Sequence, residues 1–140
     1  MESYEQRVRE SFARQAMMKT LGAEMSSVRN GAIEIRFPFS ASLTQQHGFV
    51  HAGAVTTALD SACGYAALTV APEGLEVLSV EFKVNLLAPA TGPAIVARAQ
   101  VKRAGKTIAV CTGDAFAVRP EGEKLIATML ATMIYVPVQK

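Results

Sequence analysis

One acidic residue lies within a long small and apolar stretch of the sequence. The segment QQHGFVHAGAVTTALDSACGYAAL, Gln45–Leu68, contains a single carboxylate, Asp60, and no Lys, Arg or Glu occurs between Phe37 and Pro72. A carboxylate withdrawn from water without a partner is costly. Asp60 is therefore either a helix residue hydrogen-bonded to a neighbour, or a carboxylate held in a cleft as a general base or nucleophile.

Gly53 adds a second group that could do chemistry. A glycine near a helix start lets a ligand approach free backbone N–H groups, where the helix dipole favours developing negative charge. Gly53 and Asp60 are seven residues apart, so they lie roughly 10 Å apart along one helix. One bound carbonyl cannot contact both groups of the same helix. If both act on it, a second chain must supply its Asp60, as two antiparallel helices across a two-fold axis would.

The two histidines, His47 and His51, have the i, i+4 spacing of a zinc site. No Glu lies between them as in His-Glu-x-x-His, no further His exists, and Gly48 argues against a helix there. We therefore predict no metal and no cofactor. His51 either organises the loop before the helix or contacts the substrate.

The composition excludes several classes of protein. The net charge of +2 and the scattered Lys and Arg do not favour nucleic acid as a partner. The N-terminus, MESYEQRVRESFARQ, has no apolar signal core, and Asp60 interrupts the best candidate for a membrane span. Two cysteines, Cys63 and Cys111, indicate reduced packing residues rather than a disulfide framework. These features predict a cytoplasmic protein without a membrane partner.

The elements that must position Asp60 follow from local patterns. Apolar residues recur every four positions near the N-terminus, at Tyr4, Val8 and Phe12, which predicts a helix over about 3–19. Asn30-Gly31 is a strong hairpin signal. Helix formers between Gly53 and Pro72 predict a helix over about 53–70, buried on more than one side because most of its circumference is apolar.

Four strand-like segments follow the central helix, and we predict that they form a meander. The clearest is VLSVEFKVNLL, in which apolar and polar residues alternate. This order predicts a single α+β domain, 1–140, whose one antiparallel sheet curls around the central helix. Charged residues make up only 19% of the chain, and one sheet leaves edges to cover. We therefore expect a homodimer or a homotetramer of two dimers.

The segment HGFVHAGAVTTALDSACGYAA resembles the hotdog-fold thioesterases of the phenylacetate-degradation (PaaI) type, and the order of elements agrees over the whole chain. The family pattern is Asn-x-x-Gly-x-x-His-Gly-Gly, followed by an acid in the central helix. Residues of this chain stand at those positions in the order Gln45, Gly48, His51, Ala52, Gly53 and Asp60. Two of them depart from the pattern. Ala52 keeps the N–H of a glycine but adds a methyl group, and Gln45 keeps an amide on a longer arm.

The resemblance implies a thioesterase that hydrolyses an acyl-coenzyme A to free acid and thiol. The N–H of Ala52 or Gly53 would bind the carbonyl oxygen, and Asp60 of the neighbouring subunit would act as general base or nucleophile. Ser79, in LSVEFKVNLLAPA, would hold the attacking water. The basic residues of the hairpin after the fourth strand are either ligands of the coenzyme A phosphates or solvated charges: Lys102, Arg103 and Lys106.

Three other functions stay open from the sequence. A hotdog protein can be a hydratase, but the Asp–His dyad of that class has no counterpart here. It can bind acyl-CoA without catalysis, and a missing helical acid would favour that function, whereas Asp60 is present. It can also be purely structural, in which case Asp60 is replaceable. The preferred acyl group is not readable from the sequence.

Overall fold

The computed structural model describes residues 3–139. Three α-helices, a short 3₁₀ helix and six strands follow one another along these residues. In chain order they are α1 (Tyr4–Arg14), α2 (Ala16–Leu21), β1 (Glu24–Arg29), β2 (Ala32–Pro38), η1 (Ala41–Leu43), α3 (Ala52–Thr69), β3 (Leu75–Leu86), β4 (Ala94–Ala104), β5 (Ile108–Arg119) and β6 (Gly122–Pro137).

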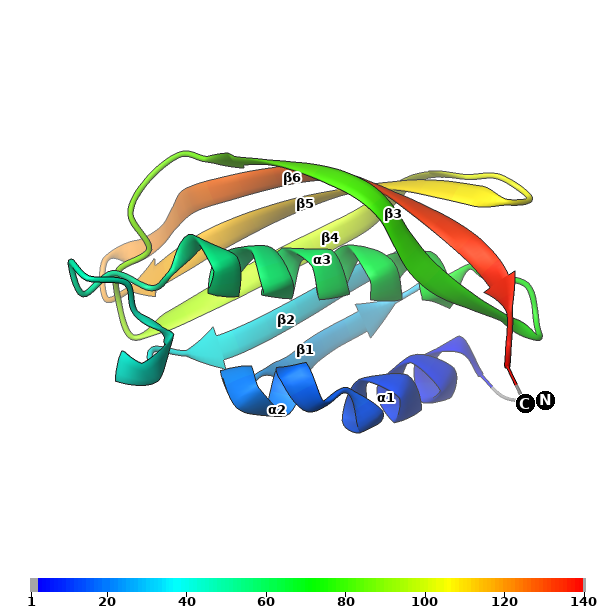
Figure 1. The fold of residues 1–140 in the computed structure, drawn as a ribbon, viewed down its shortest axis with the longest axis horizontal. Helices are drawn as coiled ribbons and strands as arrows, with labels where there is room; N and C mark the ends of the chain where they lie inside the picture. Colours follow the sequence, from blue (N-terminus) through cyan, green and yellow to red (C-terminus); the bar gives the residue numbers. More distant parts are fainter. Residues whose placement is uncertain (1–2, 140) are drawn as a thin grey trace.

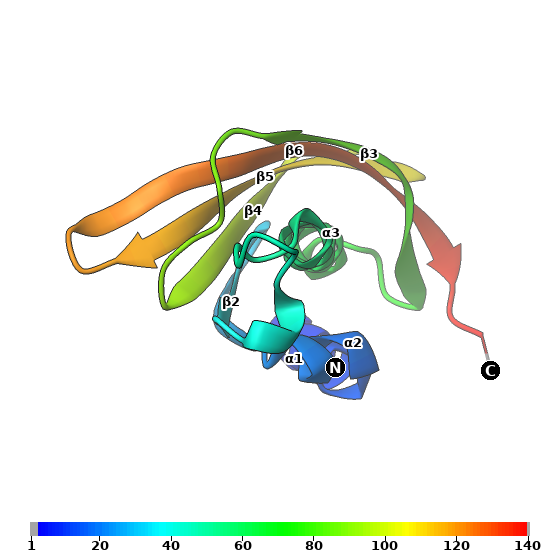
Figure 2. The same ribbon diagram turned by 60° about the vertical axis from the view of Figure 1, so that its left-hand side comes forward.

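The strands form one antiparallel sheet in the order β1-β2-β4-β5-β6-β3. Figure 1 shows α3 lying along the concave face of this sheet, and Figure 2 looks nearly along the helix and shows the sheet curving around it. The predicted α+β architecture, a curved sheet wrapped around a long central helix, is confirmed. The central helix begins and ends within one residue of the predicted range 53–70.

The predicted four-strand meander is wrong in one respect. Strands β4, β5 and β6 are consecutive neighbours, but β3 pairs with β6 at the edge of the sheet, and β4 pairs with β2. The chain leaves the end of α3 on the side away from β1 and β2, and residues 87–93 then cross the strand ends to reach β4 (Figure 2). Alternation reveals which face of a strand is buried, but it does not identify the neighbouring strand.

The predicted N-terminal helix over 3–19 is also corrected, because it is broken at Gln15 into α1 and α2. Gln15 has extended backbone angles, φ −83° and ψ 105°, and its side chain hydrogen-bonds to Tyr65 and Ser61 of α3. These tertiary contacts fix Gln15 between the two helices. The periodic pattern of α1 still places Val8 in the core.

The hairpin predicted at Asn30-Gly31 joins β1 to β2, and Gly31 has the positive φ of 78° that such a turn requires. A second glycine, Gly113 of β5, lets α3 lie close to the sheet. A Cβ atom there would come within 3.2 Å of both Cys63 Sγ and Leu59 Cδ2. The central helix is therefore seated firmly on the middle of the sheet.

The β3 edge of the sheet is much more exposed than the rest. Most of its residues are exposed on both faces, including Leu78 at 58%, Val80 at 56% and Phe82 at 42%. The opposite edge, β1, is contacted by α1, where Arg9 donates a hydrogen bond to the Met25 carbonyl. A long, apolar and unpaired edge strand is a surface on which another chain can pair.

Candidate active site

Asp60 lies in the middle of α3, half-buried, with its side chain directed toward β3. Its Oδ1 accepts a hydrogen bond of 2.7 Å from Ser79 Oγ, and Ser79 also contacts Met133 Sδ at 3.4 Å. The two residues that the sequence assigned to base and water binding are therefore in direct contact. Asp60 does have a hydrogen-bonding neighbour, so the contact alone fits both interpretations of this carboxylate.

The backbone of β3 is irregular at Ser79. The pairing of β3 with β6 shifts register between Ser79 and Glu81, which leaves Val80 in a bulge. Ser79 pairs with Met133, whose side chain is fully buried on the concave face. Ser79 therefore points toward α3. Bulges of this kind often direct a side chain at a functional site.

Asp60 and Ser79 line a cavity of about 800 Å³. We call it the carboxylate cavity. Its walls come from α1, Gln15, the second half of α3, the loop after α3 and the start of β3. Several side chains of α1, Gln15 and α3 are polar: Arg7, Glu10, Ser11, Arg14, Gln15, Ser61 and Tyr65. The Asp60 carboxylate is thus open to a molecule placed in this cavity.

The start of α3 is capped by His51. Its Nδ1 accepts a hydrogen bond of 2.7 Å from the Gly53 N–H, which requires the ring proton to be on Nε2. The Gly53 N–H is therefore not free to bind a carbonyl oxygen. The Ala52 N–H has no acceptor within residues 3–139. Of the two predicted donors, only Ala52 is available, and of the two roles left open for His51, organising the helix start is the one its hydrogen bond supports.

The loop before α3 is held by Gln45. Its Oε1 accepts hydrogen bonds from the backbone N–H groups of His47 at 2.6 Å and Phe49 at 3.2 Å, which orients the amide NH₂ away from the loop backbone. Gly48, at the tip of this loop, has a φ of 83°. This positive φ explains why a glycine stands at this position of the motif, since a residue with a side chain would strain the backbone there.

A second cavity of about 480 Å³ lies at the helix start, and we call it the N-terminal cavity. It is mostly apolar, and its lining comes from the loop before α3, the first turns of α3, the loop after β3 and β6: Gln45, Phe49, Val50, His51, Ala52, Val55, Leu86, Leu87, Ala88, Pro89, Ala90, Ile126 and Ala127. The two cavities share no lining residue. Ala52 and Asp60 are eight residues apart, or about 12 Å along the helix. One chain does not bring them together.

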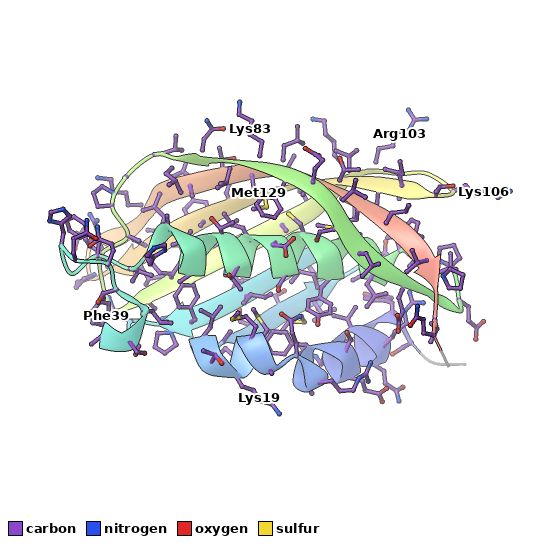
Figure 3. The ribbon with its side chains drawn as sticks, viewed as in Figure 1. Lys19, Phe39, Lys83, Arg103, Lys106 and Met129 are labelled. Carbon is purple, nitrogen blue, oxygen red and sulfur yellow. The ribbon has the colours of Figure 1, made fainter. Side chains whose placement is uncertain are left out.

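The basic residues predicted for phosphate binding lie elsewhere. Lys102, Arg103 and Lys106 are exposed around the turn between β4 and β5, and none of them lines either cavity. Figure 3 shows Arg103 and Lys106 at the opposite end of the molecule from Phe39, which precedes the loop of Gln45. Within a single chain they are not part of the site.

Neither cysteine lies at the candidate site, and both are packing residues. Cys63 and Cys111 are free and fully buried, as predicted for packing residues, and burial raises the pKa of both thiols, that of Cys111 to about 11. In the part of the chain that the structure describes, no three His, Cys, Asp or Glu side chains gather as a metal site would need. None of the helices over residues 3–139 has the length and hydropathy to span a membrane.

Three residues near Asp60 were not foreseen from the sequence. Gln15, between α1 and α2, reaches across to α3, where it hydrogen-bonds to Ser61 and Tyr65 at the carboxylate cavity. The sequence carried a signal for two of them. Tyr65 is the only aromatic residue in an Ala-rich helix, and Gln15 follows directly on the last residue of the periodic helix α1.

Known proteins resemble this chain in fold and in sequence. The solved structure of a thioesterase family protein from Silicibacter pomeroyi is 50% identical, covers 97% of this chain and 100% of its own, and has a TM-score of 0.95. The PaaI protein of E. coli, from the phenylacetic acid degradation operon, is 21% identical over 95% of this chain and 93% of its own, with a TM-score of 0.83. It supports the fold alone.

A curated relative from Halobacterium salinarum, named as a candidate esterase, is 30% identical over 99 residues, which are 67% of this chain and 65% of that relative. The chain therefore spans a little less than two thirds of that relative's length. The model of the thioesterase superfamily matches residues 47–123, more than half of the 140 residues, and this match includes Asp60 and Ser79. The chain belongs to the thioesterase superfamily and has its hotdog fold.

Proposed function

We propose that this protein is an acyl-CoA thioesterase whose active site is shared between two subunits. The observation that carries the proposal is the Asp60–Ser79 hydrogen bond at a cavity, together with the free N–H of Ala52 at the start of the same helix. A carboxylate, a water-binding hydroxyl and an unpaired N–H donor are the groups that acyl transfer to water needs.

The distance between the two halves supports a second copy of the chain as partner. Ala52 and Asp60 are separated by about 12 Å, so one thioester carbonyl cannot contact both in one chain. If two copies pair through their β3 edges, their α3 helices run antiparallel, and Asp60 of one faces the helix start of the other. The exposed Leu78, Val80 and Phe82 would then be covered. We propose a homodimer, or a homotetramer of two such dimers.

In the proposed reaction the thioester oxygen accepts hydrogen bonds from the Ala52 N–H and from the Gln45 amide. Asp60 takes a proton from a water molecule that Ser79 helps to hold, and the water oxygen attacks the carbonyl carbon. The C–S bond then breaks, and the thiolate leaves and takes up the proton. In the alternative route an Asp60 oxygen attacks the carbonyl carbon, the C–S bond breaks and the thiolate leaves. Water then hydrolyses the mixed anhydride to the free acid and the Asp60 carboxylic acid, whose proton passes to the thiolate.

The other residues assigned from the resemblance keep supporting roles in the proposal. His51 holds the helix start and can donate from Nε2 to the substrate, and Gly48 shapes the loop that carries Gln45. Lys102, Arg103 and Lys106 remain candidates for the coenzyme A phosphates, which they would reach only outside the cavities. A cytoplasmic location remains part of the proposal.

The proposal is tested by measuring thiol release from aliphatic and aromatic acyl-CoAs with the parent chain and with Asp60→Asn. We expect kcat to fall at least about a hundredfold, because the amide cannot accept the proton. Substrate binding and thermal stability should be kept, since the amide has the same shape and its oxygen can still accept from Ser79.

Three outcomes would contradict it. Tight acyl-CoA binding without turnover in the parent would indicate a non-catalytic acyl-CoA-binding protein. If Asp60→Asn instead lowered the melting temperature and left the folded fraction active, Asp60 would be a structural anchor. Light scattering that shows a monomer at micromolar concentration would rule out the shared site.

A further inference from the structure

A chain of hydrogen bonds forms part of the wall of the carboxylate cavity, directly beside Asp60. Ser61 Oγ donates to Gln15 Oε1 at 3.0 Å, and Gln15 Nε2 donates to the Tyr65 hydroxyl at 2.9 Å. Ser11 Oγ also donates to the Tyr65 hydroxyl, at 3.3 Å. All four residues line the cavity. These hydrogen bonds link α1 and Gln15 to the face of α3 that carries Ser61 and Tyr65.

Donors remain unused in this chain of hydrogen bonds. The Tyr65 hydroxyl accepts both of its bonds, so its own proton has no acceptor among residues 3–139, and neither has the second proton of Gln15 Nε2. Tyr65 is only 7% exposed. A ligand that fills the cavity would cut these donors off from water, and a donor left without a partner costs free energy, so the ligand gains by offering an acceptor at this place.

The position along α3 indicates which part of a substrate meets these donors. Tyr65 follows Asp60 by five residues, about 7.5 Å along the helix axis. A thioester carbonyl beside Asp60 would therefore have a group several bonds away at Tyr65. The side chains around the cavity include four carboxylates (Glu10, Asp60, Glu73, Glu76) and two guanidinium groups (Arg7, Arg14).

This charge balance argues against two kinds of ligand. Arg7 is already engaged, because it donates to the carbonyls of Leu68 at 2.6 Å and Ala71 at 2.9 Å at the end of α3. The remaining excess of carboxylates disfavours the phosphates of coenzyme A and also an acyl group that ends in a carboxylate. The part of the substrate that fits here is an uncharged acyl group.

We propose that Tyr65 and Gln15 are specificity-determining residues, which select an acyl group carrying an uncharged oxygen acceptor, a hydroxyl or a ketone, several bonds from the thioester carbon. This inference rests on the proposed thioesterase function and names its substrate class. A site built to hydrogen-bond such an oxygen discriminates against the analogue that lacks it, because the donors of the site are then left unpaired.

The experiment compares kcat/KM for 6-hydroxyhexanoyl-CoA and 8-hydroxyoctanoyl-CoA with the isosteric heptanoyl-CoA and nonanoyl-CoA. In the parent, at least one hydroxylated substrate should be preferred over its isostere by about tenfold or more. Tyr65→Phe keeps the edge-to-face contact with the Phe12 ring, whose centroid lies 6.0 Å away, and removes the hydroxyl, which is the free donor and also the acceptor for Ser11 and Gln15. In this variant the ratio should fall toward one.

Tyr135→Phe is the matched control. Tyr135 is also buried, at 6% exposure, and donates its hydroxyl to the Ala67 carbonyl at 3.2 Å, but it does not line the carboxylate cavity. Its substitution should leave the ratio unchanged. If the hydrogen bonds of Tyr65 only hold α1 on α3, Tyr65→Phe would lower stability and change both members of each pair equally, which would overturn the inference.

The two proposals can fail separately. Hydrolysis of the acyl-CoAs without preference for any hydroxylated member, or an unchanged ratio in Tyr65→Phe or in Gln15→Met, overturns this inference and leaves the thioesterase function in place. Calorimetry with Asp60→Asn measures binding of the same four acyl-CoAs without turnover. A preference in binding that Tyr65→Phe abolishes, in a parent that hydrolyses none of them, would support the selection and contradict the thioesterase function.

Discussion

The two cavities along α3 differ in the kind of group that each offers. The N-terminal cavity has apolar walls, and its free donor, the Ala52 N–H, belongs to the backbone. The carboxylate cavity has walls of mixed polarity, and its reactive groups, Asp60 and Ser79, are side chains. In the proposed reaction the N-terminal cavity stabilises negative charge on the thioester oxygen, and Asp60 in the carboxylate cavity accepts the proton of the attacking water.

Substitution can remove the reactive side chains of the carboxylate cavity more easily than the backbone donor of the N-terminal cavity. A side-chain group is lost by a change of one residue type to another, whereas a backbone N–H is kept by every residue except proline. The sequence can therefore vary at Ala52, as it does from the glycine of the family pattern, without loss of the donor. The same freedom does not exist at Asp60. Four predictions test this division.

The largest effect is expected for Ala52→Pro. Ala52 is the first residue of α3, a position where proline fits a helix, and His51 before it has the extended ψ of 138° that proline requires. The variant should fold, yet lack the proposed oxyanion donor. We expect kcat to fall about a hundredfold to a thousandfold. Steady-state thiol release measures it, with thermal melting to show that the fold is kept.

Ala52→Gly is the control for the proline variant, because it keeps the N–H and removes only the methyl group. Its activity should stay within a few-fold of the parent. Equal losses in the glycine and proline variants would show that the side chain at this position matters and that the N–H does not.

The second prediction tests whether the two cavities act across subunits. Chains carrying Asp60→Asn are mixed with chains carrying Ala52→Pro, then dissociated and re-associated. In a random mixture half of the dimers combine both chains, and each has one intact site, so about a quarter of parental activity should return. If both variants alone are folded and inactive and the mixture stays inactive, the two halves of the site do not come from different subunits.

A smaller effect is expected for Ser79→Ala. The substitution removes the hydroxyl that donates to Asp60 Oδ1 at 2.7 Å but leaves the carboxylate. If Ser79 positions water, kcat should fall by less than about tenfold with little change in KM, because substrate binding is not affected. Thr132→Val, on the same sheet and hydrogen-bonded to Glu81, is a matched loss of a hydroxyl outside both cavities. A parental rate in Ser79→Ala would remove Ser79 from the site.

The smallest effect concerns an ion-pair cluster that lines neither cavity. Arg98 donates to Glu34 at 2.7 Å and to Glu123 at 2.6 Å. Partial burial raises the pKa of Glu34, but hydrogen bonds from Arg98 and Ser26 outweigh it and leave the pKa below its ordinary value of 4.5. The hydrogen bond from Arg98 likewise lowers the pKa of Glu123.

Carboxylates whose pKa is lower in the folded state stabilise it above their ordinary pKa, and this contribution is lost as the pH falls through the lower folded values. Arg98→Met should therefore lower the free energy of unfolding at pH 7 by about 1 kcal/mol or less, since the pairs are partly exposed. The difference should shrink below about pH 4. Urea unfolding at several pH values measures it. Activity should match the parent, and a large loss would mean that the cavities are not the only sensitive regions.

The sequence by itself determined the central helix, the first hairpin and the position of the one carboxylate in that helix. The hairpin at Asn30-Gly31 and the central helix follow from patterns within a few residues of one another, and the structure has both. The sequence also marks Asp60 as the one carboxylate between Phe37 and Pro72. Such patterns can be recognised in the sequence because turn geometry and helix periodicity depend on residues that are close together in the chain. The cost of burying a charge likewise marks a single carboxylate within an apolar segment. The resemblance to the PaaI-type thioesterases added Ser79 to the candidate site.

Tertiary structure alone decided how these pieces are combined. That β3 pairs with β6, that Gln15 breaks the N-terminal helix, and that His51 takes the Gly53 N–H and leaves the Ala52 N–H free are outcomes of packing. Each depends on which groups compete for the same partner once the chain has folded. The two pieces of the candidate site were readable from the sequence, but their separation into two cavities was visible only when the helix lay on its sheet.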